Sequence, residues 1–250
     1  MDKIDPLCQA TPREADIRAR IEAVRQRITA ACGRVGRNPA EVTLVAVTKT
    51  VSASAIQAAY LAGVSFFGEN RVQEAAVKIS PAFRRESVGE RSEPQWHLIG
   101  HLQTNKAKKA LELFQVIQSI DSLHLAKVLQ QHAAARQSHV EVFVEVNTSG
   151  EPSKFGVSPD QALPLVQVVA ELPNLQLTGL MTIGALTDDA KIIRGCFRRL
   201  RALRDEIAAA GLPGVHLRHL SMGMTDDFEL AIAEGSTMVR VGRAIFGERA

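Results

Sequence analysis

The sequence predicts an α/β fold, a single (β/α)8 TIM-type barrel preceded by an extra N-terminal helix. Its 250 residues are about the length at which one such barrel forms a complete core. Short apolar runs alternate with stretches of helical periodicity, the order that produces a parallel sheet. No G-x-G-x-x-G turn follows the first run, so the alternative of an open doubly wound sheet is less favoured.

The elements follow one another in a regular order. Residues 1–11 are expected to form a flexible leader and residues 12–250 the barrel domain. Apolar residues at Ile17, Ile21 and Val24 predict an amphipathic helix within 12–37 that covers the barrel. The expected strands are 42–48, 64–68, 95–100, 115–120, 140–146, 175–183, 216–221 and 238–242. The expected helices between them are 53–62, 71–79, 105–111, 122–135, 159–172, 189–210 and 226–234, with a charged loop at 81–94.

Composition and charge narrow the class of protein. A net charge of +3 with one Trp and one Tyr offers little for nucleic-acid binding. Cys8, Cys32 and Cys196 include no C-x-x-C pair, so neither a disulfide framework nor a zinc site is expected. No stretch approaches the roughly 18 apolar residues of a spanning helix. The expectation is a cytoplasmic protein with no membrane partner.

Lys49 is the first candidate functional residue, because it follows an apolar run where a lysine has no evident structural role. It shares the parity of Val45 and Val47, so an inward orientation of those side chains would direct its ammonium into the barrel mouth. A desolvated lysine has a lowered pKa and can form an imine with an aldehyde. The alternative is a lysine that ends a strand and extends into solvent.

A phosphate cradle is predicted at the ends of the seventh and eighth strands, where barrels of this kind commonly bind phosphate. Ser221 and Gly223 close the seventh strand, and Gly242 and Arg243 close the eighth. Glycines let backbone N–H groups approach phosphate oxygens, and the serine hydroxyl adds a donor. Turn formation alone would explain either glycine but not both together with a serine.

Arg240 lies between Val239 and Val241 in a strand expected to be buried on both faces. A buried guanidinium needs an acceptor. Glu145 is one candidate, and the ring nitrogen of a pyridine-type ligand is the other. A guanidinium that never loses its proton would keep such a nitrogen unprotonated and weaken the ring as an electron sink.

Motifs along nearly the whole chain carry a resemblance to a known family. They are AVTKT (46–50), FGENRVQE (67–74), WHLIGHLQTNK (96–106), KFG (154–156), GLMTI (179–183), LSMGMTDD (220–227) and GSTMVRVGRAIFG (235–247). With them the chain resembles the pyridoxal-phosphate homeostasis proteins, also called the YggS/PROSC family. The resemblance implies a barrel similar to the N-terminal barrel of alanine racemase, fold type III among proteins that bind pyridoxal 5'-phosphate (PLP).

The same resemblance implies the residues that bind PLP. The cofactor is expected as a Schiff base on Lys49, with Arg240 at its pyridine nitrogen. The other expected binding residues are Asn70, His97 and Met181 lining the pocket, and Ser221, Met222, Gly223, Gly242 and the backbone of Arg243 around the phosphate. Arg243 stands where Thr or Ser is frequent in the family, so a role for its side chain is not expected.

The predicted function is that of a PLP carrier or regulator in intracellular PLP homeostasis, without robust turnover. It has no expected catalytic residue or metal site, apo PLP-dependent enzymes are candidate recipients, and a monomer is expected. An amino-acid racemase is the alternative, but it needs a second acid or base. Tyr60 is the only tyrosine and the sequence ends three residues after Gly247, so no such base is expected. An aldolase-type barrel acting on a sugar phosphate is a third hypothesis.

Three further features near the predicted mouth also carry expectations. Lys154, in the loop after the fifth strand, is expected to be solvated, with receipt of the cofactor during transfer as the alternative. His97 and His101 have the spacing of zinc helices, but a strand is predicted there and no metal site is expected. Asp226 and Asp227 are expected at a helix start, where a negative charge interacts favourably with the positive end of the helix dipole.

Overall fold

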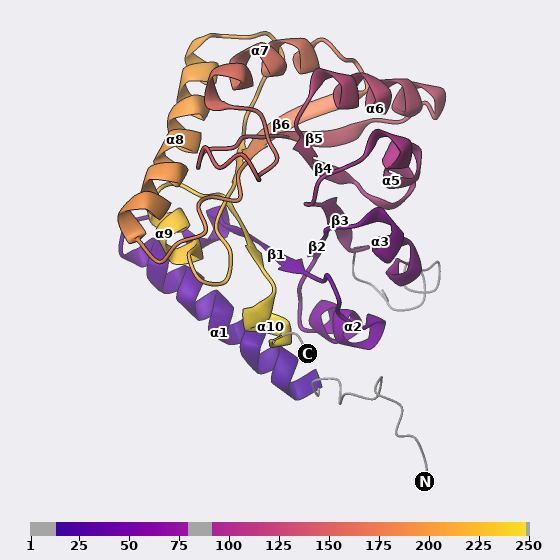
Figure 1. Ribbon diagram of the computed structural model, residues 1–250. Helices are drawn as coiled ribbons and strands as arrows, with labels where there is room; N and C mark the ends of the chain where they lie inside the picture. The colour runs from indigo at the N-terminus through magenta and orange to yellow at the C-terminus, as the bar shows by residue number, and fades with distance from the viewer. Residues whose placement is uncertain (1–13, 80–91, 249–250) are drawn as a thin grey trace.

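The computed structural model is a closed barrel of parallel strands that follow one another in chain order (Figure 1). It describes residues 14–79 and 92–248. The strands are β1 (Thr43–Val47), β2 (Phe66–Glu69), β3 (Gln95–Leu98), β4 (Val116–Ile120), β5 (Val140–Glu145), β6 (Leu175–Met181), β7 (His219–Ser221) and β8 (Met238–Val241). β8 pairs with β1 and places Arg240 beside Val45. The predicted barrel is confirmed, and the open sheet is excluded.

The helices lie around the outside of the barrel. They are α1 (Glu14–Gly33), α2 (Ala53–Leu61), α3 (Val72–Lys78), α5 (Ala107–Leu113), α6 (Leu123–Ala135), α7 (Pro159–Ala170), α8 (Ala190–Ala209), α9 (Phe228–Ala233) and α10 (Arg243–Phe246). Short 3-10 turns occupy η1 (Pro39–Glu41) and η2 (Thr104–Lys106). The expected helices are all found, whereas η1, η2 and α10 were not predicted. The predicted leader and residues 81–91 of the predicted charged loop lie outside the described residues.

Polar side chains set the starting points of several helices. Ser52 accepts a hydrogen bond from Ala55 N at the start of α2, and Ser122 accepts one from Leu125 N at the start of α6. Asp189 accepts from Lys191 N and Ile192 N at the start of α8. Such caps satisfy backbone N–H groups that have no partner inside the helix.

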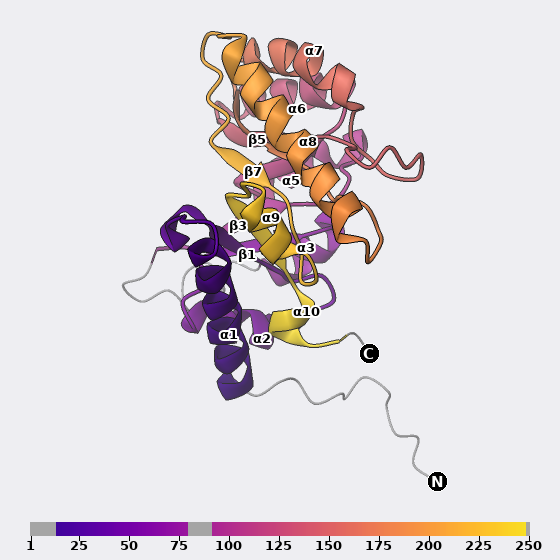
Figure 2. The same cartoon turned by 90° about the vertical axis from the view of Figure 1, so that its left-hand side faces the viewer.

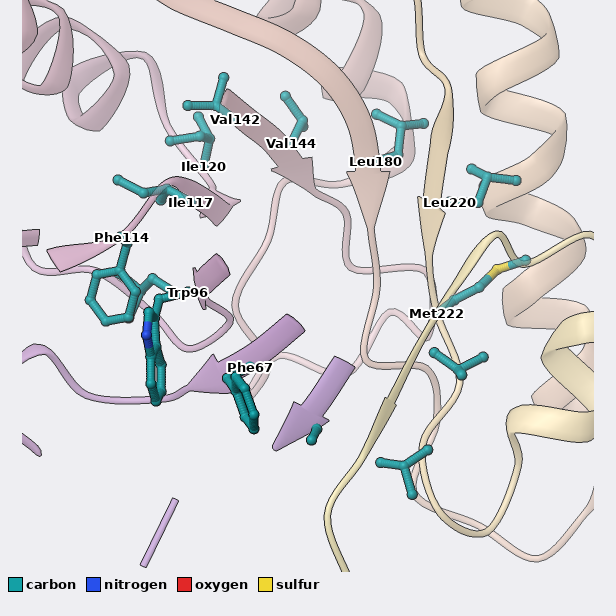
Figure 3. Close-up of a cluster of buried hydrophobic side chains, with 14 of the residues drawn as sticks. Phe67, Trp96, Phe114, Ile117, Ile120, Val142, Val144, Leu180, Leu220 and Met222 are labelled. Atoms are coloured by element: carbon teal, nitrogen blue, oxygen red, sulfur yellow. The ribbon is translucent and has the colours of Figure 1, made fainter. Parts of the chain in front are cut away.

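The hydrophobic core has an outer and an inner layer. The outer layer lies between strands and helices and includes Phe67, Ile117, Val142 and Leu220 (Figure 3). The inner layer fills the barrel with Val45, Val116, Phe143, Met181 and Met238. Strand side chains alternate between these layers, so the inner cluster identifies the inward parity of each strand.

Helix α1 closes one side of the molecule by packing against α2, α9 and α10 (Figures 1 and 2). Its residues Ile17, Ile21, Val24 and Ile28 are buried, as the apolar spacing predicted. Within the described ranges, the structure has no helix of sufficient length and hydropathy to cross a membrane.

Candidate functional site

A buried hydrogen-bond network crosses the barrel interior and joins four strands. Arg240 of β8 donates from Nη1 to Ser221 Oγ of β7 over 2.7 Å. Ser221 Oγ donates in turn to Gln118 Oε1 of β4 over 2.6 Å. Gln118 Nε2 lies 2.8 Å from His97 Nδ1 of β3. The structure therefore joins three predicted site residues through Gln118, which had not been predicted.

Arg240 is held by neutral oxygen atoms. Besides Ser221 Oγ, its guanidinium donates to the Thr182 carbonyl over 2.8 Å, and no described carboxylate lies within 4 Å of it. Burial lowers the pKa of Arg240 to about 10, opposed by the charges of Glu145 and Asp227, so the side chain remains protonated at neutral pH. The direct ion pair with Glu145, one of the two predicted alternatives, is not formed.

His97 is a neutral donor facing the interior. Burial, with a smaller contribution from His219, lowers the pKa of His97 to about 3. Since Gln118 Oε1 accepts from Ser221, the amide nitrogen of Gln118 donates to His97 Nδ1 and leaves the imidazole proton on Nε2. Nε2 is buried and has no partner among the described residues.

Glu145, at the carboxyl end of β5, has an unusual protonation state. Burial and, to a smaller extent, the charge of Asp121 raise its pKa, Arg240 opposes them, and the resulting pKa is about 7. Its Oε2 is buried without a partner in the described part of the chain. Asp121 lies 2.8 Å from His101 Nδ1, and the His101 ring stacks on Phe155. Two carboxyl groups and an imidazole therefore lie near the carboxyl ends of β4 and β5.

The two predicted phosphate loops meet at the carboxyl ends of β7 and β8. Gly223 has a φ of +94°, and its carbonyl accepts a hydrogen bond from Arg240 N, which ties the loop after β7 to strand β8. A Cβ on Gly223 would lie 2.5 Å from the Ala231 Cβ of α9, so only glycine permits this approach. Gly242 packs beside Val47. Neither glycine N–H donates to a backbone carbonyl of the described residues, so both are available to an anion.

The aspartates after Gly223 immediately precede α9, as predicted, and Asp227 occupies its N-cap position. Asp227 accepts a hydrogen bond from Met224 N over 2.6 Å and makes no side-chain cap to α9. Asp226 pairs with the Arg243 guanidinium, which also lies 3.5 Å from Glu248. The side chain of Arg243 therefore holds the loop from outside, consistent with the expectation that only its backbone faces the ligand.

Lys49 lies two residues after β1, in a turn at residues 49–50, and is partly buried. Val45, which shares its parity, belongs to the inner cluster. Thr50 has a φ of +62°, a left-handed conformation that is rare for a residue with a side chain. The strand end and its tight turn place Lys49 at the same end of the barrel as Gly223 and Gly242.

The remaining predicted residues differ in what they can contribute. Met181 is buried in the inner cluster. Asn70 follows β2, and its Oδ1 is buried without a partner among the described residues. Met222 lies in the outer hydrophobic layer (Figure 3), so only its backbone could approach a ligand. Strand alternation from the inward Ser221 would have identified this orientation.

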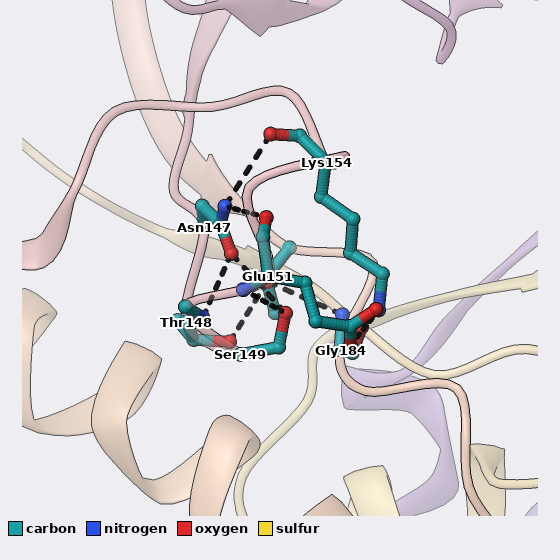
Figure 4. A network of polar contacts seen from close by, with 8 residues as sticks. Asn147, Thr148, Ser149, Glu151, Lys154 and Gly184 are labelled. Atoms are coloured by element: carbon teal, nitrogen blue, oxygen red, sulfur yellow. Dashed lines mark hydrogen bonds and ion pairs between the residues drawn. The ribbon is translucent and has the colours of Figure 1, made fainter.

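Lys154 is held within a loop network, and the prediction of a solvated side chain was wrong. Its ammonium pairs with Glu151 over 2.6 Å and donates to the Gly184 carbonyl (Figure 4). Its side chain is 18% exposed. Asn147 organises the same loop through hydrogen bonds to the Glu151 and Lys154 carbonyls. Lys154 thus links the loops after β5 and β6.

A cavity of about 470 Å³ lies at the other end of the barrel. It is lined by α1, η1 and the amino ends of β1 and β2, and includes Arg25. Arg25 already donates to the Ala62 and Gly63 carbonyls. None of the predicted site residues lines this cavity, so the mouth remains the candidate site.

The donor set at the mouth fits a phosphorylated pyridine aldehyde. A partly buried lysine supplies an amine, and the N–H groups of Gly223 and Gly242 supply anion donors. Buried atoms of Asn70, His97 and Glu145 have no described partner, and each could receive one from a polar ligand. Sequence patterning could have identified Gln118, because it is a polar residue in the middle of a predicted strand.

Comparisons with known proteins agree on the family and the fold. Residues 19–250 match the family model of the alanine racemase N-terminal domain. The pyridoxal phosphate homeostasis protein of Aquifex aeolicus (strain VF5) is 41% identical over 230 residues, covering 92% of this chain and 97% of that protein. An unknown protein from Bifidobacterium adolescentis has a TM-score of 0.89 at 44% identity, covering 98% of both chains. PipY of Synechococcus elongatus PCC7942, solved with PLP bound, has a TM-score of 0.78 at 35% identity, covering 92% of this chain and 100% of that chain.

Proposed function

The chain belongs to the pyridoxal phosphate homeostasis protein family, and we propose that it binds PLP at the barrel mouth as a carrier or regulator of intracellular PLP. The solved structure of PipY with PLP bound supports this proposal, since PipY is similar over 92% of this chain. The fit between the donors at the mouth and the groups of PLP supports it independently.

Each part of the ligand has a counterpart among the residues of the mouth. Lys49 Nζ would bond covalently to the aldehyde carbon as a Schiff base. The N–H groups of Gly223 and Gly242, with the first turn of α10, would bind the phosphate. Asn70, His97 and Met181 would line the ring. Ser221 would act through Arg240, because its hydroxyl is already hydrogen-bonded to Gln118 and Arg240.

The observation that carries the proposal is the state of Arg240. A guanidinium that is protonated at neutral pH is buried at 4% exposure, and its partners are a hydroxyl and a carbonyl rather than a carboxylate. Such a group is positioned to hydrogen-bond a ring nitrogen and to keep that nitrogen unprotonated. Bound PLP supplies an electron-withdrawing ring. Arg240 would weaken that withdrawal, which suits retention of the cofactor better than demanding carbanion chemistry.

The racemase alternative is disfavoured by the position of Tyr60. A two-base racemase needs an acid or base on each face of the substrate. Tyr60 lies on α2, is 3% exposed, and donates to the Ser92 carbonyl before β3 begins. It therefore sits near the amino ends of the strands, away from Lys49. We accordingly propose binding without robust turnover.

The setting of this function is part of the same proposal. The protein would act in the cytoplasm as a monomer and deliver PLP to apo PLP-dependent enzymes. The buried, unpaired thiols of Cys32 and Cys196 are compatible with a reducing compartment.

Spectroscopy of protein incubated with PLP tests the proposal. An imine absorbance band should form, Lys49→Ala should abolish it, and borohydride reduction should fix the cofactor mass on the peptide containing Lys49. Lys109→Ala is the matched control, because Lys109 is an exposed lysine on α5. Absence of the band in the unsubstituted protein would refute PLP binding. Racemisation of any amino acid at enzymatic rates would refute the proposed carrier function and support the racemase alternative.

A further inference from the structure

The peptide groups on both sides of Lys49 are held by one cluster of charged side chains. Before Lys49, the Thr48 carbonyl accepts a hydrogen bond from Lys78 Nζ over 2.6 Å. After Lys49, Thr50 N donates to Glu74 Oε1. Glu74 and Lys78 lie one turn apart on α3 and pair with each other over 2.6 Å. One helix thus contacts the backbone immediately before and immediately after Lys49.

Lys78 is fully hydrogen-bonded in this position. An ammonium has three donors, and those of Lys78 have three acceptors: the Thr48 carbonyl, Glu74 and Glu69. Its side chain is 11% exposed. Protein acceptors have therefore replaced most of the water around the ammonium, and one of them is the carbonyl group that precedes Lys49.

Glu69 completes the cluster from the end of β2. Its side chain is wholly buried, and Oε1 accepts from Lys78 Nζ over 2.9 Å and from Thr48 Oγ1 over 2.6 Å. Burial raises the pKa of Glu69, opposed by the hydrogen bonds from Thr48 and Lys78. Its Oε2 has no partner among the described residues. We define Glu69, Glu74 and Lys78 as the clamp.

The turn that the clamp holds is strained. Thr50 has a φ of +62°, which costs a residue with a side chain roughly 1 kcal/mol. A buried ion pair is seldom more stable than apolar residues of the same volume, so stability alone explains the clamp poorly. A cluster of this kind is better suited to selecting one backbone conformation. The backbone that it selects is the one on either side of Lys49.

We propose that Glu69, Glu74 and Lys78 are positioning residues for Lys49. By holding the Thr48 carbonyl and the Thr50 N–H, they fix both peptide planes of Lys49 and so determine the direction in which its side chain leaves the strand. The inference rests on the proposed function, because the position of Lys49 matters most for bonding to an aldehyde. Its first measurable consequence, order in the turn, does not depend on the ligand.

Three variants separate positioning from simple stabilisation. Glu74→Ala removes the acceptor of Thr50 N–H at a side chain that is 25% exposed, so the fold should tolerate it. Glu74→Gln keeps an oxygen acceptor there and should restore the behaviour of the unsubstituted protein. Lys109→Met is the control, because it removes an i,i+3 ion pair with Glu112 on the neighbouring helix α5.

The measurements are hydrogen–deuterium exchange of the peptide containing Thr50, trace acetylation of Lys49 by acetic anhydride, and equilibrium binding of PLP. In Glu74→Ala we expect about tenfold faster exchange, a changed acetylation rate at Lys49, and affinity for PLP about tenfold weaker. Lys109→Met should change none of these. Unchanged hydrogen–deuterium exchange and unchanged acetylation of Lys49 in Glu74→Ala would overturn the proposal that the clamp positions Lys49. If the unsubstituted protein binds no PLP, the proposed function fails, while exchange and acetylation still decide the clamp.

Discussion

Arg240 and Ser221 are hydrogen-bonded side chain to side chain inside the barrel, with Nη1 donating to Oγ over 2.7 Å. The same serine hydroxyl donates to Gln118. Its hydrogen-bonding capacity is therefore directed toward Arg240 and away from the phosphate loops. The prediction that Ser221 contacts the phosphate directly remains untested, and the geometry favours an indirect role.

The Ser221–Gln118 hydrogen bond should be detectable as an energetic coupling. We expect Ser221→Ala and Gln118→Leu each to lower the unfolding free energy by about 1–3 kcal/mol, since each leaves a buried polar group unpaired. The loss of unfolding free energy in the double variant should differ from the sum of the two single losses by about 1 kcal/mol. Urea unfolding measures all three. Ser122→Ala, which removes the cap of α6, should be additive with Gln118→Leu, and additivity in the first pair would contradict the network.

Arg240→Met should destabilise the protein more than an arginine substitution at the surface. The charge of Arg240 opposes the raised pKa values of Glu145 and Asp227, so its removal leaves two buried carboxyl groups without that favourable field. We expect a loss of about 3 kcal/mol in unfolding free energy. Arg243→Met, at a side chain 44% exposed, should cost less than about 1 kcal/mol. Equal losses in the two variants would show that Arg240 is not important for stability.

Gly223→Ala should damage the phosphate loop through contact as well as through backbone strain. Its φ of +94° disfavours a side chain, and the new Cβ would lie 2.8 Å from Phe228 Cα. Gly214→Ala is the control, because Gly214 has a φ of +74° with nothing within 4 Å. We expect Gly214→Ala to lower the unfolding free energy by about 1 kcal/mol and Gly223→Ala to lower it by at least about twice that, as measured by urea unfolding. Similar values would indicate that α9 moves aside.

Glu145 should make stability decrease as pH rises. The folded protein holds the Glu145 proton up to a pKa of about 7, whereas the ordinary value is 4.5. The stability that this proton contributes is therefore fully present below the ordinary pKa and is lost as pH rises through the folded one. As the pH rises from about 5 to about 8, the unfolding free energy of Glu145→Gln should increase by roughly 2 kcal/mol relative to that of the unsubstituted protein. A pH-independent difference in urea unfolding would contradict the raised pKa.

Local sequence patterns predicted most of the elements because they carry strong periodicity. Helix α10 was missed because its four residues are too few to show a helical period. Lys154 was assigned to solvent because its acceptor, the Gly184 carbonyl, is 30 residues away in the sequence. Gln118 and Ser221 are 103 residues apart, so their contact depends on closure of the barrel.

The sequence by itself determined the alternation of strands and helices, the family, and the residues that end each strand at the mouth. These follow from apolar periodicity and from motifs, both of which are local in the chain. Only the tertiary structure decided which side chains meet. It joined Arg240 to Ser221, and it brought Glu74 and Lys78 of α3 to the peptide groups after and before Lys49. Hydrogen bonds and burial depend on distances across the closed barrel, and no local pattern specifies those distances.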